Sequence, residues 1–209
     1  MARRNHTDKR KNKSRQENKI FLIVTEDTES AYNYFQILRK ENRLHTLNIE
    51  VKPSKKSAPD QVISFTKKLA EAKDAELSFC IIDRDTHEHF DEAINDANKI
   101  KNLEIIASFP CFEYWIILHH NKDCYRPMNA KECIRETTNR FKSYEKSMDT
   151  QTWSNFYKNE LAKNQDTAIE KAILAEENCR KDDTENPKTD IYKLFNTKGY
   201  PFYKENKSN

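Results

Sequence analysis

Three acidic residues stand where two short apolar segments of the chain end. Residues 20–25 are followed by Glu26, and residues 77–82 are followed by Asp83 and Asp85. Apolar runs of this length are typical of strands buried on both faces, as in a parallel sheet, whose ligands bind at the carboxyl ends of the strands. If the two strands are neighbours, three carboxylates meet at one edge and repel one another, and a divalent cation is the usual remedy. The pattern therefore predicts a Mg²⁺ or Mn²⁺ site that handles phosphates.

The elements around these acids predict an α/β fold. Strands expected at residues 20–25, 47–52, 77–82 and 103–107 alternate with helical segments, which indicates a parallel sheet of about four strands flanked by helices. After Pro110 the pattern changes to four helical segments, expected at residues 112–120, 131–146, 154–163 and 166–180. Asn186-Pro187-Lys188-Thr189 is expected to cap a further short helix. We therefore expect three parts, a basic disordered arm, an α/β core and a helical C-terminal region packed on the core: residues 1–18, 19–125 and 126–209.

The composition of the chain excludes glycine-rich phosphate-binding motifs and a membrane-spanning segment. The chain has a single glycine, Gly199, so neither a GxGxxG motif nor a Walker A loop can be present. Phosphates would have to be bound by a metal, by Lys or Arg, or by helix N-termini. The five cysteines form no CxxC pair, and an odd count without a signal peptide predicts a reduced, cytoplasmic protein. No apolar segment approaches the roughly 18 residues of a membrane span, so we expect no contact with a membrane.

The first 19 residues are strongly basic. They hold eight Lys and Arg residues against two acidic ones, a net charge of +6, whereas the whole chain carries +3 and the remainder therefore −3. A basic arm on a slightly acidic body can hold a polyanion near an acidic site, and a solvated tail is the alternative. The candidate nucleic-acid contacts are Arg3, Arg4, Lys9, Arg10, Lys11, Lys13 and Arg15 in the arm, with Lys55 and Lys56 in a predicted loop.

Four segments of the chain resemble one known family. Together with the basic N-terminus they are similar to the RloB-like family, which is associated with phage abortive infection, and the resemblance spans nearly the whole chain. The third segment is the most specific. The segments are Ile23-Val24-Thr25-Glu26 with Tyr34-Phe35, then Asp83-Arg84-Asp85, then Ser108-Phe109-Pro110-Cys111-Phe112-Glu113-Tyr114-Trp115 with Leu118-His119, and Asn186-Pro187-Lys188-Thr189.

The resemblance implies a TOPRIM-like, Rossmannoid core that acts as a metal-dependent nuclease on RNA, with tRNA as one candidate, or on DNA. Glu26 would match the first-strand glutamate, a metal ligand or general base. Asp83 and Asp85 would match the Asp-x-Asp pair that holds Mg²⁺, and Glu113 would match a further catalytic acid. Family members often sit beside an ATPase of the ABC or AAA type, which implies a regulatory partner chain. Formation of a homodimer is left open.

The chain departs from the family's pattern after the first strand. The family usually reads Glu-Gly-x-x-Thr-Glu there, whereas this chain has Asp27 at the glycine, Ser30 at the threonine and Ala31 at the second glutamate. Glu29 or Asp27 is the candidate substitute for the missing acid. A non-catalytic, degenerate TOPRIM-like module that binds nucleic acid or the ATPase is therefore the main alternative. Nucleotidyl transfer of the primase kind is a third.

Two residues next to the Asp-x-Asp pair are auxiliary candidates. Arg84 lies between the two acids, so its side chain should point to the opposite side of the chain, where a structural ion pair is favoured over a phosphate contact. His87 could serve as a proton shuttle or bind phosphate, although histidines in loops are usually exposed and without a role.

Overall fold

The computed structural model describes residues 20–42, 48–56, 58–84, 87, 89–122 and 126–204. The basic arm, Asp85 and the last five residues lie outside this part of the chain. Within it, no helix is long and apolar enough to cross a membrane.

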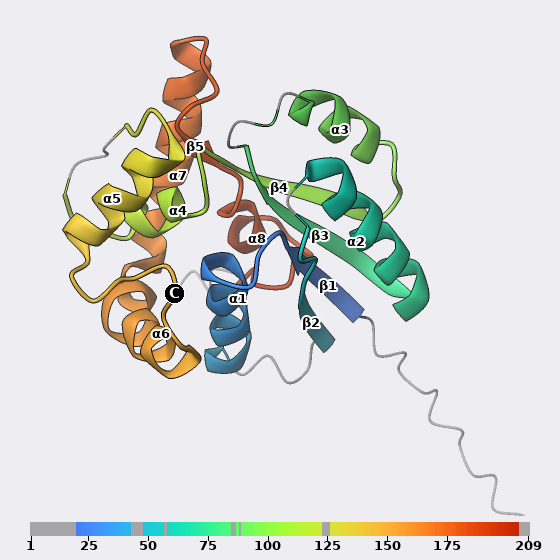
Figure 1. Cartoon of the computed structure of the whole chain (residues 1–209), viewed down its shortest axis with the longest axis horizontal. Coiled ribbons are helices and arrows are strands. Elements are labelled where there is room, and N and C mark those ends of the chain that lie inside the picture. The colour runs from blue at the N-terminus through green and yellow to red at the C-terminus, as the bar shows by residue number, and fades with distance from the viewer. Residues whose placement is uncertain are drawn as a thin grey trace, which may run out of the picture.

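The described residues form one mostly parallel sheet of five strands in the order β2-β1-β3-β4-β5 (Figure 1). Strands β1 to β4 pair in parallel, and β5 pairs with β4 in the antiparallel direction. The α/β prediction is therefore confirmed, with a fifth strand added at one edge. The strands are β1 (Ile20–Thr25), β2 (Asn48–Pro53), β3 (Ala75–Asp83), β4 (Leu103–Phe109) and β5 (Lys188–Thr189).

Helices connect the parallel strands and make up most of the chain after β4. Two of them have clear sequence signals at their ends: Pro59 lies in the first turn of α2, and the side chain of Asn129 caps α5 by accepting from the backbone N–H of Glu132. The helices are α1 (Ser30–Glu41), α2 (Pro59–Lys73), α3 (Phe90–Ala97), α4 (Glu113–Leu118), α5 (Ala130–Arg140), α6 (Thr150–Phe156), the π-helix η1 (Tyr157–Leu161), the 3-10 helix η2 (Ala162–Asn164), α7 (Gln165–Lys181) and α8 (Lys193–Asn196).

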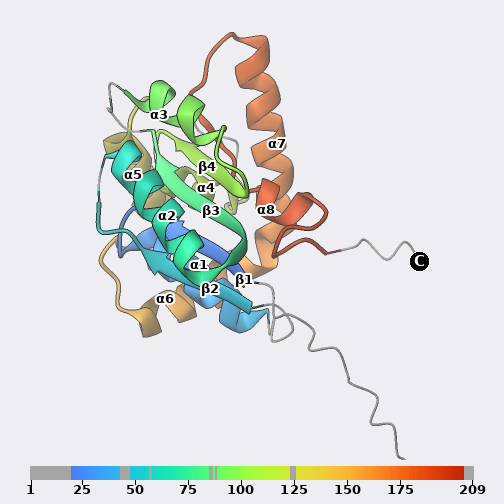
Figure 2. The same cartoon turned by 90° about the vertical axis from the view of Figure 1, so that its right-hand side faces the viewer.

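The sheet is covered on both faces, which explains the continuous apolar runs of its central strands. Leu22 and Val24 pack on one side against α2 and α3, whereas Phe21 and Ile23 pack on the other side in a larger core. That larger core also takes in residues of α1, α4, α5, α6, η1, α7 and α8. Figures 1 and 2 show α2 and α3 on one face, with α1, α4, α7 and α8 on the other. The helical C-terminal part therefore shares its core with the sheet.

Two elements differ from the sequence prediction in ways that matter for the site. We expected Asn186-Pro187-Lys188-Thr189 to cap a helix, but Lys188 and Thr189 form β5 on the edge of the sheet. We also expected a helix over residues 131–146, but α5 ends at Arg140 because Phe141 is extended and buried. The chain then turns and places Tyr144 in the core.

A buried histidine makes the stability of this core depend on pH. His119, at the end of α4, is fully buried, and its Nδ1 lies 2.9 Å from the carbonyl oxygen of Trp115. Burial lowers the pKa of His119 from 6.5 to about 4. Between these two values the unfolded chain binds a proton that the folded chain excludes, so the free energy of unfolding falls as pH falls, by roughly 3 kcal/mol in all.

Denaturation by urea across the same pH range tests this account. His119→Asn cannot titrate, and its amide can still donate to the Trp115 carbonyl, so its free energy of unfolding should fall less on acidification than that of the wild type. His89→Asn, at an exposed position, serves as the control and should keep the wild-type pH profile. Parallel profiles for His119→Asn and the wild type would contradict the assignment.

Candidate functional site

The ends of β1 and β3 lie side by side, as the sequence predicted. The strands pair in parallel with Thr25 opposite Ile81, and the backbone N–H of Glu26 donates to the carbonyl of Ile81 at 3.2 Å. The carboxylate of Glu26 then reaches across to Asp83, where its Oε2 accepts from the backbone N–H at 3.3 Å. Glu26 and Asp83 therefore share one edge of the sheet, whereas Asp85 lies outside the described residues.

Glu113 approaches this edge from the start of α4, directly after β4. Its side chain is only 1% exposed, and its Oε1 accepts hydrogen bonds from Ser30 Oγ and Tyr144 OH, each at 2.9 Å. The two hydroxyls themselves lie 2.9 Å apart. Three segments far apart in the sequence thus converge on one buried carboxylate: the first turn of α1, the start of α4 and the turn after α5.

The second oxygen of Glu113 is the unusual atom of this group. Oε2 is shielded from water and has no hydrogen-bond partner among the residues that the structure describes. A buried carboxylate oxygen without a partner costs free energy, and in a native protein a bound water or ion is an ordinary partner for such an atom. The atom is therefore a candidate ligand position.

The acidic residues influence one another strongly. Burial, then the negative charges of Glu113 and Glu26, raise the pKa of Asp83 well above its usual value, although the N–H of Phe112 acts in the opposite direction. Burial is also the main reason why the pKa of Asp27 is raised, and Glu113 adds to it. We use the term acidic cluster for Glu26, Asp27, Asp83 and Glu113.

One lysine compensates part of this charge. Burial by itself would lower the pKa of Lys146, but the carboxylates of Glu113, Asp27 and Asp83 together raise it. Lys146 lies two residues after Tyr144, in the same turn after α5. Sequence reasoning missed both residues, because this turn was expected to be helical and because Lys146 is one of 37 lysines and arginines in the chain.

The structure shows where the residues lie that depart from the family's pattern after the first strand. Ala31, where a second glutamate was expected, is buried in the core and supplies no acid. Asp27 instead joins the cluster, with its Oδ1 accepting from the N–H of Glu29 at 3.1 Å. Glu29 lies near enough for its charge to act on Asp27 and Lys146. Ser30, at the family's threonine position, was not a predicted site residue, yet it donates directly to Glu113.

Lys55 and Lys56 lie in a loop that is tied to the same edge. Ser54 donates from its backbone N–H to the carbonyl of Thr25 at 2.8 Å and from its hydroxyl to the carbonyl of Glu26 at 3.0 Å. Both lysine side chains are exposed beside this anchor. The basic residues predicted in the arm, by contrast, lie outside the described residues.

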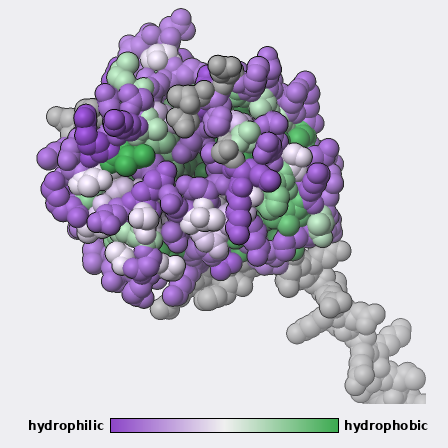
Figure 3. Space-filling model, in the orientation of Figure 1, coloured by the Kyte–Doolittle hydropathy of each residue, from purple (hydrophilic) through white to green (hydrophobic). Residues whose placement is uncertain are grey.

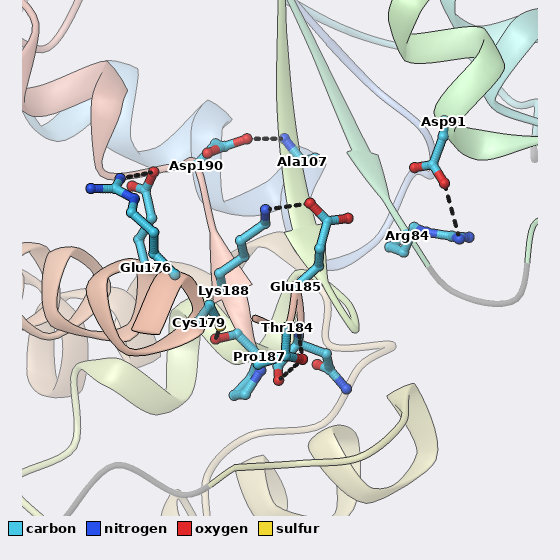
Figure 4. Close-up of polar contacts among 12 residues, drawn as sticks. Arg84, Asp91, Ala107, Glu176, Cys179, Thr184, Glu185, Pro187, Lys188 and Asp190 are labelled. Atoms are coloured by element: carbon cyan, nitrogen blue, oxygen red, sulfur yellow. Dashed lines mark hydrogen bonds and ion pairs between the residues drawn. The ribbon is translucent and has the colours of Figure 1, made fainter. Parts of the chain in front are cut away.

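Arg84 turns away from the acidic cluster, as expected. Its NH1 donates to the carbonyl of His87 at 2.7 Å, and its guanidinium lies 5.0 Å from the ring centre of Phe90. Its ion pair with Asp91 is long, at 3.7 Å (Figure 4). His87 thus contributes a carbonyl oxygen to the placement of Arg84.

A complete metal site is not assembled by the described residues alone. Among them, no group of three or more His, Cys, Asp and Glu side chains is arranged so that it could hold a metal ion. Two sizeable cavities lie elsewhere, about 1000 Å³ between α1, η1, α7 and α8, and about 580 Å³ beside β2 and α6, and neither is lined by the acidic cluster. The face shown in Figure 3 is mostly hydrophilic, with apolar residues scattered over it.

The hydrogen bonds to Glu113 should contribute measurably to stability. Tyr144→Phe removes one donor while the ring can still pack against Trp153 and Phe156. Because Glu113 remains buried with one donor fewer, the free energy of unfolding should fall by about 1–3 kcal/mol in urea denaturation. Tyr34→Phe is the matched control, since this buried hydroxyl donates to the neutral amide of Gln165 at 3.0 Å and its loss should cost less. Equal losses would contradict a special role for Tyr144.

A comparison with models of known protein families identifies the family that the sequence segments resemble. A family model described as RloB-like protein matches residues 21–197, from the second residue of β1 to the residue after α8. No curated protein and no solved structure gave a significant match. The matched range includes the acidic cluster, the turn with Tyr144 and Lys146, and β5. The chain belongs to the RloB-like protein family.

Proposed function

We propose that the chain is a metal-dependent nuclease and the effector of an anti-phage, abortive-infection system, cleaving phosphodiester bonds in RNA or DNA. The observation that carries the proposal is the acidic cluster: Glu26 and Asp83 share one edge of a parallel sheet, and buried Glu113 adds its charge to theirs. Crowded carboxylates at strand ends are what a divalent cation requires, and the cation would in turn attract a phosphate that the carboxylates alone repel.

The oxygen atoms present suit Mg²⁺ or Mn²⁺. Mg²⁺ lies about 2.1 Å from its oxygen ligands and usually keeps several of its waters, so one or two carboxylates at the edge of the sheet are enough to bind it. Glu113 Oε2, which has no hydrogen-bond partner in the described chain, could accept from one of these waters. Glu26 and Asp83 would hold the ion together with Asp85, which lies outside the described residues. Glu113 would supply a further acid beside them, since the described side chains by themselves are not arranged as a metal site. When bound, it would neutralise the phosphate and lower the pKa of a water molecule.

Other residues of the chain would position Glu113, offset negative charge and bind phosphate. Ser30 and Tyr144 hold the carboxylate of Glu113 in one orientation. Lys146 offsets part of the negative charge and could meet a phosphate at the same edge. Lys55 and Lys56, exposed beside the end of β1, suit the backbone of a polynucleotide.

The basic arm would bind the phosphate backbone of a polynucleotide held at the acidic edge. It joins the sheet at Ile20, the start of β1, which lies about 20 Å from Glu26 at the other end of the strand. Nineteen extended residues can span at most roughly 60 Å, so the arm is long enough to reach a strand bound at the acidic edge.

The alternative function, a non-catalytic module that binds nucleic acid or an ATPase, is favoured by one observation. The family's second acidic position is Ala31, which packs in the core. The regulatory ATPase partner rests on the family resemblance alone and belongs to the proposal in either case.

Amide substitutions in the cluster separate the two functions. Glu26→Gln and Asp83→Asn keep the shape of each side chain but remove its charge, so phosphodiester cleavage and growth arrest in phage-infected cells should fall at least about 100-fold. The exposed Glu71→Gln on α2 should behave as the wild type. Sequencing of RNA and DNA ends from infected cells identifies the substrate. If both cluster variants protect cells as well as the wild type does, the non-catalytic function is correct.

Metal binding can be tested without cleavage. In EDTA at pH 7, Asp83→Asn should melt at a higher temperature than the wild type, because it lacks a half-buried carboxyl group whose pKa is raised in the folded state. This advantage should shrink as the pH is lowered toward 3.8, the usual pKa of an aspartate side chain in an unfolded chain. Addition of Mg²⁺ or Mn²⁺ should raise the melting temperature of the wild type but not that of Asp83→Asn. A metal-independent wild type would contradict the proposed site.

A further inference from the structure

Two of the four segments that resemble the family contain residues that lie outside the acidic cluster. Phe109-Pro110 precedes Glu113 by a few residues, and Asn186-Pro187-Lys188-Thr189 lies far away in the sequence. The structure brings them together at the carboxyl end of β4, because Thr189 pairs with Ser108 across the β4–β5 ladder and their hydroxyls lie 2.9 Å apart.

Residues around β5 hold this arrangement in place. Lys188 lies over the ring of Phe109, 4.8 Å from its centre, and forms an ion pair of 3.0 Å with Glu185 (Figure 4). The carboxylate of Asp190 accepts from the backbone N–H of Ala107 at 3.4 Å. The segment is therefore fixed on the strand that leads to Glu113.

Asn186 extends the arrangement to the start of α5. Its Nδ2 donates to the carbonyls of Pro127 and Met128, at 3.3 and 3.1 Å. Because both partners are carbonyls, which can only accept, the orientation of the amide is determined. Asn186 thus holds the residues before α5 beside the end of β4.

These contacts border a cavity of about 340 Å³ at the carboxyl end of β4, and no residue of the acidic cluster lines it. Arg84, on its wall, directly follows Asp83 but turns its side chain away from the cluster, and Pro110 lies three residues before Glu113. Because β3 and β4 are parallel neighbours, the cavity and the acidic edge lie at the same end of the sheet. The lining includes Arg84, Phe109, Pro110, Met128, Asn186 and Glu185, whose carboxylate is paired with Lys188.

The lining suits a flat, partly apolar group with polar edges. Phe109, Pro110 and Met128 are apolar, and Met128 is 75% exposed, one of two large hydrophobic residues so exposed in the described chain. The guanidinium of Arg84 donates to the carbonyl of His87 at 2.7 Å and forms a long ion pair of 3.7 Å with the 69% exposed Asp91. A guanidinium has five N–H donors, so these two contacts leave donors for a further acceptor. Arginine and thioether groups both pack on nucleobases and other aromatic rings.

A phosphate is a poorer occupant than a base. The start of α5 is already capped, since Asn129 accepts from Glu132 N–H and Glu132 accepts from Met128 N–H. An anion at this helix end would lie near the carboxylate of Glu132. The backbone N–H groups of Met128 and Glu132, which could otherwise bind it, already donate to side chains.

We propose that this cavity binds one unpaired nucleobase of the polynucleotide whose phosphate lies at the acidic cluster. The inference rests on the proposed function and adds the form of the substrate: a single strand, or a nucleotide turned out of a helix. It also assigns the Asn186-Pro187-Lys188-Thr189 segment to the wall of this base-binding cavity.

The test measures binding in EDTA, where no metal-dependent cleavage occurs. Fluorescence anisotropy compares a ten-nucleotide single strand, as RNA and as DNA, with an abasic strand of the same length and charge. The wild type should bind the base-carrying strand more tightly. Met128→Ala should weaken that binding about fivefold and leave the abasic strand unchanged. Met128 is exposed, so the variant should fold, which its melting temperature checks.

Leu174→Ala is the matched control, because Leu174 is the other large exposed hydrophobic residue, 46% exposed on α7. It should bind both strands as the wild type does. Equal affinity of the wild type for both strands, or equal behaviour of the two variants, would overturn the base-binding cavity. Because the assay needs neither metal nor turnover, its failure is distinguishable from failure of the nuclease proposal, which the Glu26 and Asp83 variants report.

Discussion

Parallel pairing of β1 with β3 brings Glu26 and Asp83 to one edge of the sheet, and the crowding of negative charge there constrains the surrounding structure. The pairing itself is driven by strands buried on both faces, so the position of the acids follows from the apolar core. Glu113 adds a third charge from α4. In the described chain, the charge of Lys146 and the hydrogen bonds from the Ser30 and Tyr144 hydroxyls stabilise these crowded carboxylates.

The C-terminal helical part is a component of the site as well as of the core. Tyr144 and Lys146 come from the turn after α5, and Trp153 and Phe156 pack around the Tyr144 ring. β5 crosses back to the sheet and shapes the region beyond Glu113. A site assembled from both halves of the chain makes its geometry dependent on the integrity of the whole fold.

Much of the fold could be predicted from local pattern. The parallel strands begin or end within about two residues of the expected positions, because buried strands and the segments between them carry strong period and turn signals. β5 could not be predicted, since two residues carry no periodicity and pair only because β4 offers an open edge. The early end of α5 was missed because helical spacing continues past Arg140, whereas burial of Phe141 decides where the helix stops.

The α/β class and the placement of Glu26 and Asp83 at strand ends could be read from residue type and short-range spacing, whereas Glu113 became a candidate through the family resemblance. The three-dimensional fold was needed to show that Ser30 and Tyr144 hold Glu113, that Asp27 joins the cluster, and that Lys146 lies near enough to interact with it. Hydrogen bonds and charge interactions act over a few ångströms in space, and the hydrogen bond between Ser30 and Tyr144 joins residues that lie 114 positions apart in the chain.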